Sequence, residues 1–491
     1  MRWAPMSLML ASVACAGPGP AAPATDSGAG VDGADGTSPG EDALRAAVGC
    51  TLDPGHFDAL EVEDTAQATV RRVSWRSATE GSSWLAWQTP EGRLRTTASD
   101  ATDGKHAVLA LGLVANATTE AVAVAETADG LRCSEALVLS TGPLDPALPA
   151  LTIEADDASL LEGGYVLVPM VDSGGAWLTI LDDAARIVWW WRFAADWAPE
   201  GTPAFRIELA PDGSGLITNT QGERLLDDGF FTHVSWEGEA TRMLAVQGVH
   251  TDWTFLPDGG ILTLKWVARD FPGGRRLLGD QLLEIPADGG TPRVIWDAFE
   301  AYEPDLGRSY PRNYLQGDPD IEDWTHGNGV SYVAAEDAVL LSMPGLEAVL
   351  SVDRATGASK WVVSGLVDGL DHDGDGELIQ QPHSVEALED GGVLVFNRGD
   401  WMAGTNCSRA VELDLDLDAG TASSTSTYTG PDCESVPFLG NAERLPSGGT
   451  LVTFSSSGIL DVADPSGGTA WRVRTGLGSA LGFGTYAPGL P

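Results

Sequence analysis

Short stretches of alternating apolar and polar residues recur along most of the chain, separated by Gly, Pro, Asp and Ser. Between residues 45 and 145 the stretches ATVRRVSWRS, SSWLAWQT and KHAVLALGL have this form. Alternation of this kind predicts half-buried strands, and regular turns between them are typical of a small β-sandwich. We expect Trp75, Trp87 and Leu113 in its core, and His106 at its surface or in a turn.

From about residue 155 the pattern becomes a repeated hairpin, in which one strand ends in a turn and a second strand, often carrying Trp, follows it. Six such hairpins occur, with turns near residues 182, 237, 287, 354, 415 and 465. Shorter hairpins such as LPDGGILTL and LEDGGVLVF alternate with them. A unit that recurs every 50–65 residues is typical of propeller blades. The sequence therefore predicts a six-bladed β-propeller over residues 155–488, with an irregular array of β-sandwiches as the alternative.

Composition supports an all-β chain of two domains, because 491 residues exceed one ordinary core and the chain holds 60 Gly and 29 Pro. By its pattern, the region 45–145 resembles an Ig-like or fibronectin type III module. The net charge of −43 excludes nucleic acid as a partner, since a phosphate backbone requires Lys and Arg. It also disfavours binding to anionic membrane surfaces.

The first fifteen residues, MRWAPMSLMLASVAC, have the charge and the short apolar stretch of an export signal. Cys15 stands where a bacterial lipoprotein carries its lipid, so we expect an exported outer-membrane or periplasmic lipoprotein, attached to the membrane only through this N-terminal lipid. Plain cleavage and secretion is the alternative. Residues 16–44 are rich in Ala, Gly, Pro, Asp and Ser and are expected to form a disordered linker.

Four further cysteines allow three disulfide connectivities. Because the residues fall into two groups far apart in sequence, Cys50–Cys133 and Cys407–Cys433 are the economical pairs. Oxidised pairs suit an exported protein.

Three of the seven histidines precede an apolar strand at the same phase of the repeat: His250, His326 and His383. In a propeller such positions converge at one mouth of the central channel. Three imidazoles together could hold zinc with an open fourth position. Alternatively, one neutral imidazole could attack an electrophile while its neighbours stabilise the charge that develops. Spacing alone does not separate the two.

Several of these stretches resemble the arylsulfotransferases, and the order of the motifs carries the resemblance. They are DWTHGNGVSYVAAEDAVLLS, QQPHSVEALEDGGVLVFNRG and GNAERLPSGGTLV. The resemblance implies a six-bladed propeller enzyme of the bacterial periplasm that uses no organic cofactor. It further implies transfer of a sulfuryl group from an aryl sulfate to a phenol through a covalent histidine intermediate.

Carried over by position, the resemblance implies that His383 is the nucleophile. His250 and His326 would contact the sulfuryl oxygens and assist the leaving phenol. Asn328 and Asn441 would be substrate-binding residues.

The chain departs from the family's pattern, most seriously at an Arg position, which makes it a divergent member. The family usually has an Arg after the strand that ends in LLS, where this chain reads Ser342-Met343-Pro344. A guanidinium is the side chain best suited to a sulfate. We expect Arg398 to replace it. A protein that has lost catalysis and binds a ligand or partner, and a metal-dependent hydrolase, are the competing hypotheses.

Upstream of His383, the stretch DGLDHDGDGE has Asp371, Asp373 and Asp375 at the spacing of a calcium loop. Position 12 of that loop is Pro382 and not Glu, so this is no EF-hand. The sequence predicts a structural Ca²⁺ here, with a solvated acidic turn as the alternative.

Overall fold

The computed structural model describes residues 39–78, 81–99, 101, 103–172, 175–193, 205–312, 318, 320–372, 379–399, 407–476 and 480–491. Strands dominate these residues, which confirms the all-β class. The only α-helices among them are α1 (Pro39–Val48) and the short α2 (Ala298–Ala301). No described helix is long and apolar enough to cross a membrane. The predicted signal segment with Cys15, and residues 16–38 of the predicted linker, lie outside the described residues.

The N-terminal unit consists of two antiparallel sheets apart from one parallel strand pair. The larger sheet contains β1 (Thr51–Leu52), β8 (Gly130–Cys133), β7 (Thr118–Thr127), β4 (Ser83–Gln88), β5 (Leu94–Ser99) and β9 (Leu137–Ser140). The smaller sheet contains β2 (Phe57–Asp64), β3 (Arg71–Ser77) and β6 (Lys105–Ala110). Alternate residues of both sheets point inward, and Trp75, Trp87 and Leu113 are buried in the shared core as expected.

The expectation for His106 is wrong, because its side chain is buried. The ring stacks on Trp75 with 5.2 Å between the ring centroids. The hydroxyls of Ser77 and Ser99 lie 3.0 Å from its two nitrogens. Both polar atoms therefore have partners, which removes the cost of burying a neutral imidazole.

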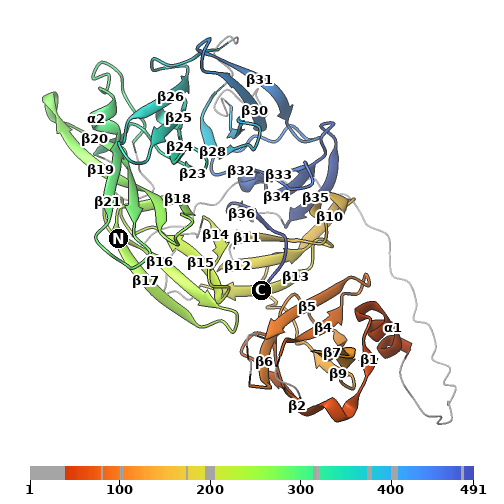
Figure 1. The fold of residues 1–491 in the computed structure, drawn as a ribbon. Helices are drawn as coiled ribbons and strands as arrows, with labels where there is room; N and C mark the ends of the chain where they lie inside the picture. Colours follow the sequence, from red (N-terminus) through yellow and green to blue (C-terminus); the bar gives the residue numbers. More distant parts are fainter. Residues whose placement is uncertain are drawn as a thin grey trace.

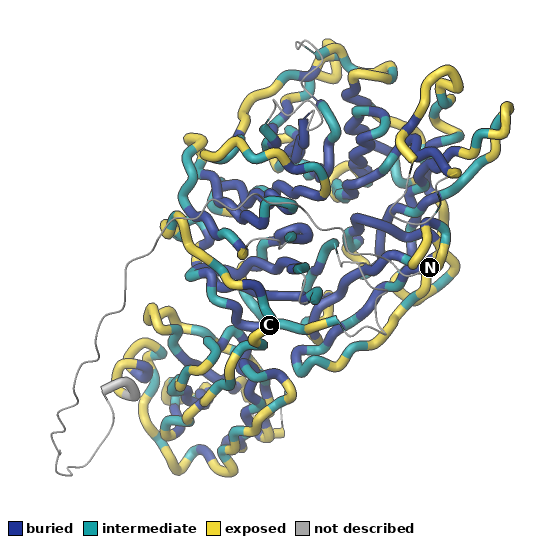
Figure 2. The backbone as a smooth tube through the Cα atoms, turned by 180° about the vertical axis from the view of Figure 1, so that it is seen from behind, coloured by how far each residue is buried: buried dark blue, intermediate teal, exposed yellow. Residues whose placement is uncertain are grey.

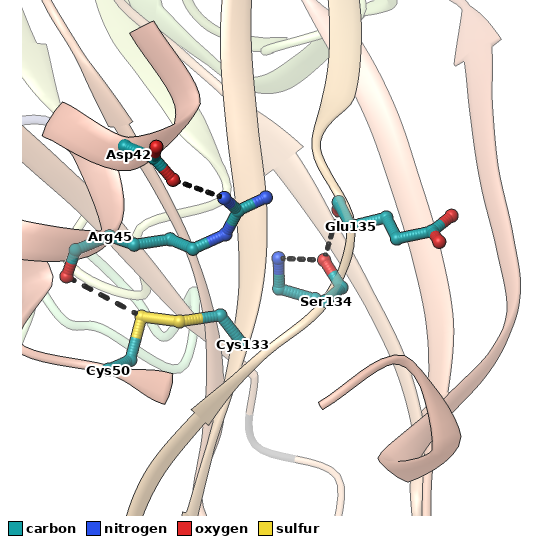
Figure 3. Close-up of a disulfide and its surroundings, with 7 residues drawn as sticks. Asp42, Arg45, Cys50, Cys133, Ser134 and Glu135 are labelled. Carbon is teal, nitrogen blue, oxygen red and sulfur yellow. Dashed lines mark hydrogen bonds and ion pairs between the residues drawn. A yellow bond between two sulfur atoms is a disulfide. The ribbon is translucent and has the colours of Figure 1, made fainter. Parts of the chain in front are cut away.

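Residues 39–44, which we expected to belong to the disordered linker, form the first part of helix α1. Leu44 of this helix packs against Val122 and Val124 of β7. The disulfide Cys50–Cys133 ties the chain after the helix to β8, and an ion pair between Arg45 and Asp42 (3.2 Å) lies beside it (Figure 3). Burial of Leu44, packing of Val48 and a covalent link thus hold this helix, although its first residues resemble a linker.

The rest of the chain forms six sheets, each built around four antiparallel strands (Figure 1). The first contains β11 (Tyr165–Asp172), β12 (Gly175–Asp182) and β13 (Ile187–Arg192), completed by β36 (Ala480–Leu481) and β37 (Thr485–Ala487). The second contains β14 (Ile207–Leu209), β15 (Gly215–Thr220), β16 (Asp228–Ser235) and β17 (Ala240–Gln247). The third contains β18 (Val249–Phe255), β19 (Ile261–Phe271), β20 (Arg275–Ile285), β21 (Arg293–Asp297) and β22 (Ile321–Asp323).

The other three sheets repeat this plan. The fourth contains β23 (Gly329–Val333), β24 (Ala338–Met343), β25 (Ala348–Asp353) and β26 (Ser359–Ser364). The fifth contains β28 (Pro382–Ala387), β29 (Val393–Asn397), β30 (Arg409–Asp416), β31 (Thr421–Tyr428) and the two-residue β27 (Asp371–His372). The sixth contains β32 (Asn441–Arg444), β33 (Thr450–Phe454), β34 (Ile459–Ala463), β35 (Thr469–Thr475) and β10 (Leu151–Asp156).

The turns that the sequence predicted separate the third and fourth strands of these sheets, for example β25 from β26 and β34 from β35. Shorter Asp-Gly turns separate the first and second strands. In two of them the carboxylates of Asp258 and Asp390 accept hydrogen bonds from Gly260 and Gly392 (2.9 and 3.0 Å). The side chain thereby closes the turn locally, which is why Asp and Gly occur there.

Apolar side chains fill the space between each sheet and the next in a closed cycle. Leu340 of the fourth sheet packs with Val393 of the fifth, for example, and Leu451 of the sixth packs with Val166 of the first. The inner strands β18, β23, β28 and β32 lie beside one another, and they are largely buried, whereas the peripheral strands carry most of the exposed positions (Figure 2). Residues at equivalent places on the inner strands are therefore brought together.

The two ends of this region complete its first and last sheets. Strand β10, which precedes the first sheet in sequence, pairs with β35 of the sixth. Strands β36 and β37, at the end of the chain, pair with β11 of the first. The N-terminal unit contacts the first and second sheets, where the Thr69 hydroxyl donates to the Val188 carbonyl (2.6 Å) and Arg72 pairs with Glu237 (2.6 Å).

Candidate active site

Several inner strands have a residue in the left-handed region of backbone conformation within or just before their first residues. The φ angles are +49° at Thr251, +51° at His326, +54° at Gln381 and +58° at Leu439. Non-glycine residues adopt this conformation rarely, and such strain gathers at functional sites. Thr251 directly follows His250, and one of the four residues is His326 itself. Gln381 and Leu439 lie two residues before His383 and Asn441, respectively. The predicted site residues thus share one structural setting.

His383 lies on β28 and is buried, with 2 % of the residue exposed. Its ring meets Phe483 edge to face, with 5.2 Å between centroids. Burial, followed by the charges of Arg398 and His326, lowers the pKa of His383 well below its usual value, although a hydrogen bond to the Gly440 carbonyl opposes this. Nδ1 is buried and has no hydrogen-bond partner among the described residues. His383 is therefore a neutral imidazole with an unoccupied nitrogen at neutral pH.

His326 precedes β23 and has the opposite electrostatic surroundings. Its Nδ1 lies 2.5 Å from Oδ2 of Asp323, and 43 % of its side chain is exposed. Desolvation alone would lower the pKa of His326, but the charge of Asp323 and the hydrogen bond to it raise this pKa above its usual value. Its proton is thus held more firmly than that of an ordinary histidine.

Arg398 follows β29 and is 5 % exposed. Its guanidinium donates to Gln381 O (3.2 Å), Gln381 Oε1 (3.1 Å) and Pro437 O (2.9 Å), all of them neutral acceptors. Within the described residues no carboxylate pairs with it. Desolvation lowers its pKa to about 10, so it stays charged at neutral pH. A buried cation without a counter-ion is costly, and a bound anion would compensate it.

Ser342, the last residue of the LLS stretch, holds the backbone of the nucleophile candidate, His383. The hydroxyl of Ser342, on β24, donates to the carbonyl of His383 (2.6 Å). Gly329 allows this approach, because a Cβ there would lie 2.7 Å from Ser342 Oγ and 2.9 Å from the His383 carbonyl. The neighbouring Asn328 is 3 % exposed, and its Nδ2 has no hydrogen-bond partner among the described residues. It is a buried donor without an acceptor.

His250, on β18, has both ring nitrogens engaged. Nδ1 lies 3.0 Å from the hydroxyl of Thr251, Nε2 lies 2.7 Å from Asp280, and the ring stacks on Trp266 at 4.2 Å. Asp280 also accepts from Thr325 Oγ1 (2.5 Å) and the Gly327 amide (2.6 Å). Burial by itself would raise the pKa of Asp280. The hydrogen bonds that it accepts oppose burial and lower this pKa, and the bond with His250 has the largest effect among them. Asp280 therefore links His250 to the residues on either side of His326 through hydrogen bonds.

Asn441 begins β32 and is 4 % exposed. Its Nδ2 donates to the Gly484 carbonyl (2.8 Å), which links the sixth sheet to the C-terminal segment. The residue before it, Gly440, supplies the carbonyl that accepts from His383.

The predicted calcium loop is only partly visible. Asp371 belongs to β27 and is exposed, whereas Asp373 and Asp375 lie outside the described residues. Within the described part of the chain, no group of three or more His, Cys, Asp or Glu residues could hold a metal ion. Both predicted disulfides, Cys50–Cys133 and Cys407–Cys433, are present.

Sequence reasoning missed the residues that support the histidines, namely Asp280, Asp323, Ser342, Gly440 and Phe483. Only Asp323 carried a signal, because a carboxylate three residues before a histidine can reach Nδ1 when the backbone turns sharply between them. The others approach from different sheets.

Comparison with known proteins gives one family and several distant structures. A protein-family model described as Arylsulfotransferase (ASST) matches residues 178–474. No curated protein matches the chain. A solved protein of unknown function from Bacteroides caccae is 14 % identical with a TM-score of 0.39, covering 64 % of this chain and 94 % of that one. An auxiliary nutrient binding protein from Bacteroides ovatus is 12 % identical with a TM-score of 0.35, covering 86 % of each chain.

These structural similarities are too low to support an argument about fold or function. The family match is different, because it spans more than half of the chain and includes His250, His326, His383 and Arg398. The chain belongs to the arylsulfotransferase family.

Proposed function

We propose that the protein transfers a sulfuryl group from an aryl sulfate to a phenolic acceptor through a sulfo-histidine at His383. Membership of the family supports a sulfotransferase-like function in general. The observation that carries the specific proposal is the buried Arg398 guanidinium, whose acceptors among the described residues are all neutral, beside an imidazole that is neutral at neutral pH. A nucleophile next to an uncompensated cation suits an anionic electrophile such as an aryl sulfate.

The opposite pKa shifts of two imidazoles support a division of roles. His383, neutral, would attack the sulfur atom, forming an N–S bond as the bond between sulfur and the phenol oxygen breaks. His326, protonated, would give its proton to the departing oxygen. In the second half-reaction, neutral His326 would take the proton of the acceptor phenol, whose oxygen attacks sulfur as the N–S bond breaks. Two titratable groups whose pKa values are pushed apart are the expected acid and base of such a cycle.

Arg398 and Asn328 are the donors that would hold the sulfuryl oxygens. Arg398 brings a charge that no described carboxylate neutralises, and Asn328 brings a buried amide donor for which the described residues offer no acceptor. Donors fixed before the reaction stabilise charge that develops in the transition state. His250 and Asn441 are already hydrogen-bonded to the protein, so we assign them to positioning the His326 loop and the start of β32.

We further propose that the six sheets are the blades of a six-bladed propeller covering residues 155–488, preceded by an Ig-like module at 45–145. The cyclic packing of the sheets supports this. Two disulfides suit an oxidising compartment and therefore export. Lipidation at Cys15 and calcium binding by Asp371, Asp373 and Asp375 stay predictions. Loss of the lipid signal in a Cys15→Ala variant grown with labelled palmitate would test the first.

Incubation with 4-nitrophenyl sulfate and a phenol tests the function. We expect release of nitrophenol that depends on the phenol, and a mass increase on His383 when the reaction is quenched without acceptor. His383→Asn should abolish both. The control is His233→Asn, which alters an imidazole that contacts Ser214 (2.9 Å) on the second sheet and should leave both unchanged.

The competing functions give different results in the same experiment. A non-catalytic binding protein would bind the aryl sulfate without releasing nitrophenol. A metal-dependent hydrolase would release nitrophenol without acceptor, lose activity with chelator and show no adduct. Either result would overturn the proposal.

A further inference from the structure

Strand β22 is an addition to the third sheet that carries one side chain into the candidate site. It pairs in parallel with β20, through Arg276–Ile321, Leu277–Glu322 and Leu278–Asp323. Its outer face is fixed by Arg275, which binds both oxygens of Glu322 (3.1 and 2.5 Å). Its end is fixed by two backbone hydrogen bonds, from Asp323 to Pro311 (2.8 Å) and from Trp324 to Leu278 (2.9 Å).

This clamped strand places Asp323 against His326. One carboxylate oxygen of Asp323, Oδ2, lies 2.5 Å from His326 Nδ1. The other, Oδ1, is buried and has no hydrogen-bond partner among the described residues. A buried carboxyl group with one oxygen unsatisfied is a cost to folding that a purely structural residue would not need. Among the described residues, the imidazole of His326 is the one side chain that contacts this carboxyl group through a hydrogen bond.

The contact also determines which nitrogen of His326 is available. Because Nδ1–H donates to Asp323, Nε2 is left for a substrate. The left-handed backbone of His326, held by the hydrogen bonds of Asp280 to Thr325 and Gly327, turns the ring toward Asp323. The ring is still accessible, with 43 % of its side chain exposed.

We propose that Asp323 is a positioning residue that holds His326 in its charged form, so that Nε2 can give a proton to the departing phenolate oxygen. This inference rests on the proposed function and adds a group to it. The charged and titratable groups that face His326 are Asp323 on β22, Asp280 on β20, Arg398 after β29 and His383 on β28. The two carboxylates favour the imidazolium, and Arg398 opposes it.

Donors with different leaving groups provide the first test. A nitrophenolate leaves readily without a proton, whereas an unsubstituted phenolate, with a phenol pKa of about 10, depends on the acid. In Asp323→Asn, we expect kcat/KM to fall about 100-fold with phenyl sulfate and less than about tenfold with 4-nitrophenyl sulfate. The basic limb of the pH profile should move to lower pH. Asp323→Glu should restore part of the phenyl sulfate activity.

The matched control is Asp320→Asn, an exposed carboxylate three residues earlier in the same segment. It should change neither the ratio of the two donors nor the pH profile. Equal losses with both donors in Asp323→Asn, at an unchanged pH profile, would mean that Asp323 only supports the fold and would overturn the inference.

A titration by nuclear magnetic resonance of protein with labelled histidines tests Asp323 without turnover. The His326 signal, assigned from a His326→Gln variant, should titrate at lower pH in Asp323→Asn than in the parent. If the parent turns over neither donor, the proposed function fails while this titration still decides the role of Asp323. An unshifted titration would refute it. Should Asp323→Asn not fold, Asp323→Ser is the substitute for both measurements.

Discussion

At the scale of single residues, the surroundings of each imidazole determine which chemistry it can perform. His383 is buried among an aromatic ring and two cationic groups, which disfavour its protonation. His326 faces a carboxylate and solvent, which favour it. The same side chain is thereby suited to attack in one place and to proton transfer in the other.

Arg398 should contribute to catalysis at the expense of stability. In Arg398→Gln we expect kcat/KM for an aryl sulfate to fall about 100-fold or more, because a charged donor to the sulfuryl oxygens is lost. The melting temperature should not fall, because a buried charge that no described carboxylate compensates is removed as well. Enzyme assays and calorimetry measure the two effects.

The control is Arg293→Gln, which removes an exposed cation paired with Glu284 (2.8 Å) and should leave the activity unchanged. Parallel losses of activity and stability in Arg398→Gln would contradict an anion-binding role.

The sequence could indicate His326 and His383 because each precedes or begins an apolar inner strand. It could not indicate Ser342, which lies on the second strand of another sheet and holds the His383 carbonyl. Nor could it show that His250 is fully hydrogen-bonded, since Asp280 lies thirty residues away. Contacts between sheets depend on register and packing, which a linear pattern does not contain.

At the scale of elements, turns and strand entries are specified locally. The Asp-Gly turns could be predicted because their hydrogen bonds lie within a few residues. Helix α1 could not, because its burial depends on β7 and on a disulfide to β8. The supporting strand β22 was also missed, since its three residues pair with a strand more than forty positions earlier.

Gly440 connects element geometry to the site. Its φ of +114° is unsuitable for other residues, a Cβ would collide with the Phe396 ring, and its carbonyl accepts from His383. Gly440→Ala should therefore destabilise the protein by about 1–3 kcal/mol and reduce activity. Denaturant unfolding and the aryl sulfate assay measure these effects. Gly391→Ala is the control, because Gly391 also has a positive φ, of +91°, but nothing lies within 4 Å of an added Cβ. Equal effects of the two variants would show that the contact with Phe396 is unimportant.

At the scale of the whole molecule, the inner strands bring a second set of ionisable groups together. Glu208 on β14, Asp252 on β18, Glu386 on β28 and Glu443 on β32 surround Arg206. Arg206 binds Glu208 (2.6 Å) and Asp252 (3.1 Å). Burial raises the pKa of Glu443 to about 8, with the charge of Glu386 next in effect, and burial raises that of Glu386 to about 7. The positive charge of Arg206 thus interacts with all four of these carboxyl groups.

These raised pKa values predict a protein that is more stable in mild acid than in mild alkali. Glu386 and Glu443 would ionise near 4.5 in the unfolded chain but near 7 and 8 in the fold. Their stabilising effect is therefore complete below about pH 4.5 and is lost as the pH rises through 7 and 8. A tenfold difference in proton affinity between the folded and unfolded chain corresponds to about 1.4 kcal/mol of unfolding free energy.

The unfolding free energy, measured from pH 5 to 9, should therefore fall as the pH rises, and Glu443→Gln should make this fall less steep. The exposed Glu389→Gln is the control. A parallel slope in Glu443→Gln would contradict the assignment.

The all-β class and the six outer hairpins could be predicted because both arise from repeated local patterns. The way the first and last sheets are completed could not, because β10, β36 and β37 are short and pair with strands hundreds of residues away.

That completion has a consequence for biosynthesis. The first sheet receives β36 and β37 from residues 480–487, more than 300 positions after the start of β11 at Tyr165, and the sixth receives β10 from a segment made long before its partner. Until residues 480–487 have left the ribosome, the ring of sheets stays open, with a bare edge on β11. Closure therefore waits for this late segment, so a premature stop before residue 480 should leave an aggregation-prone product.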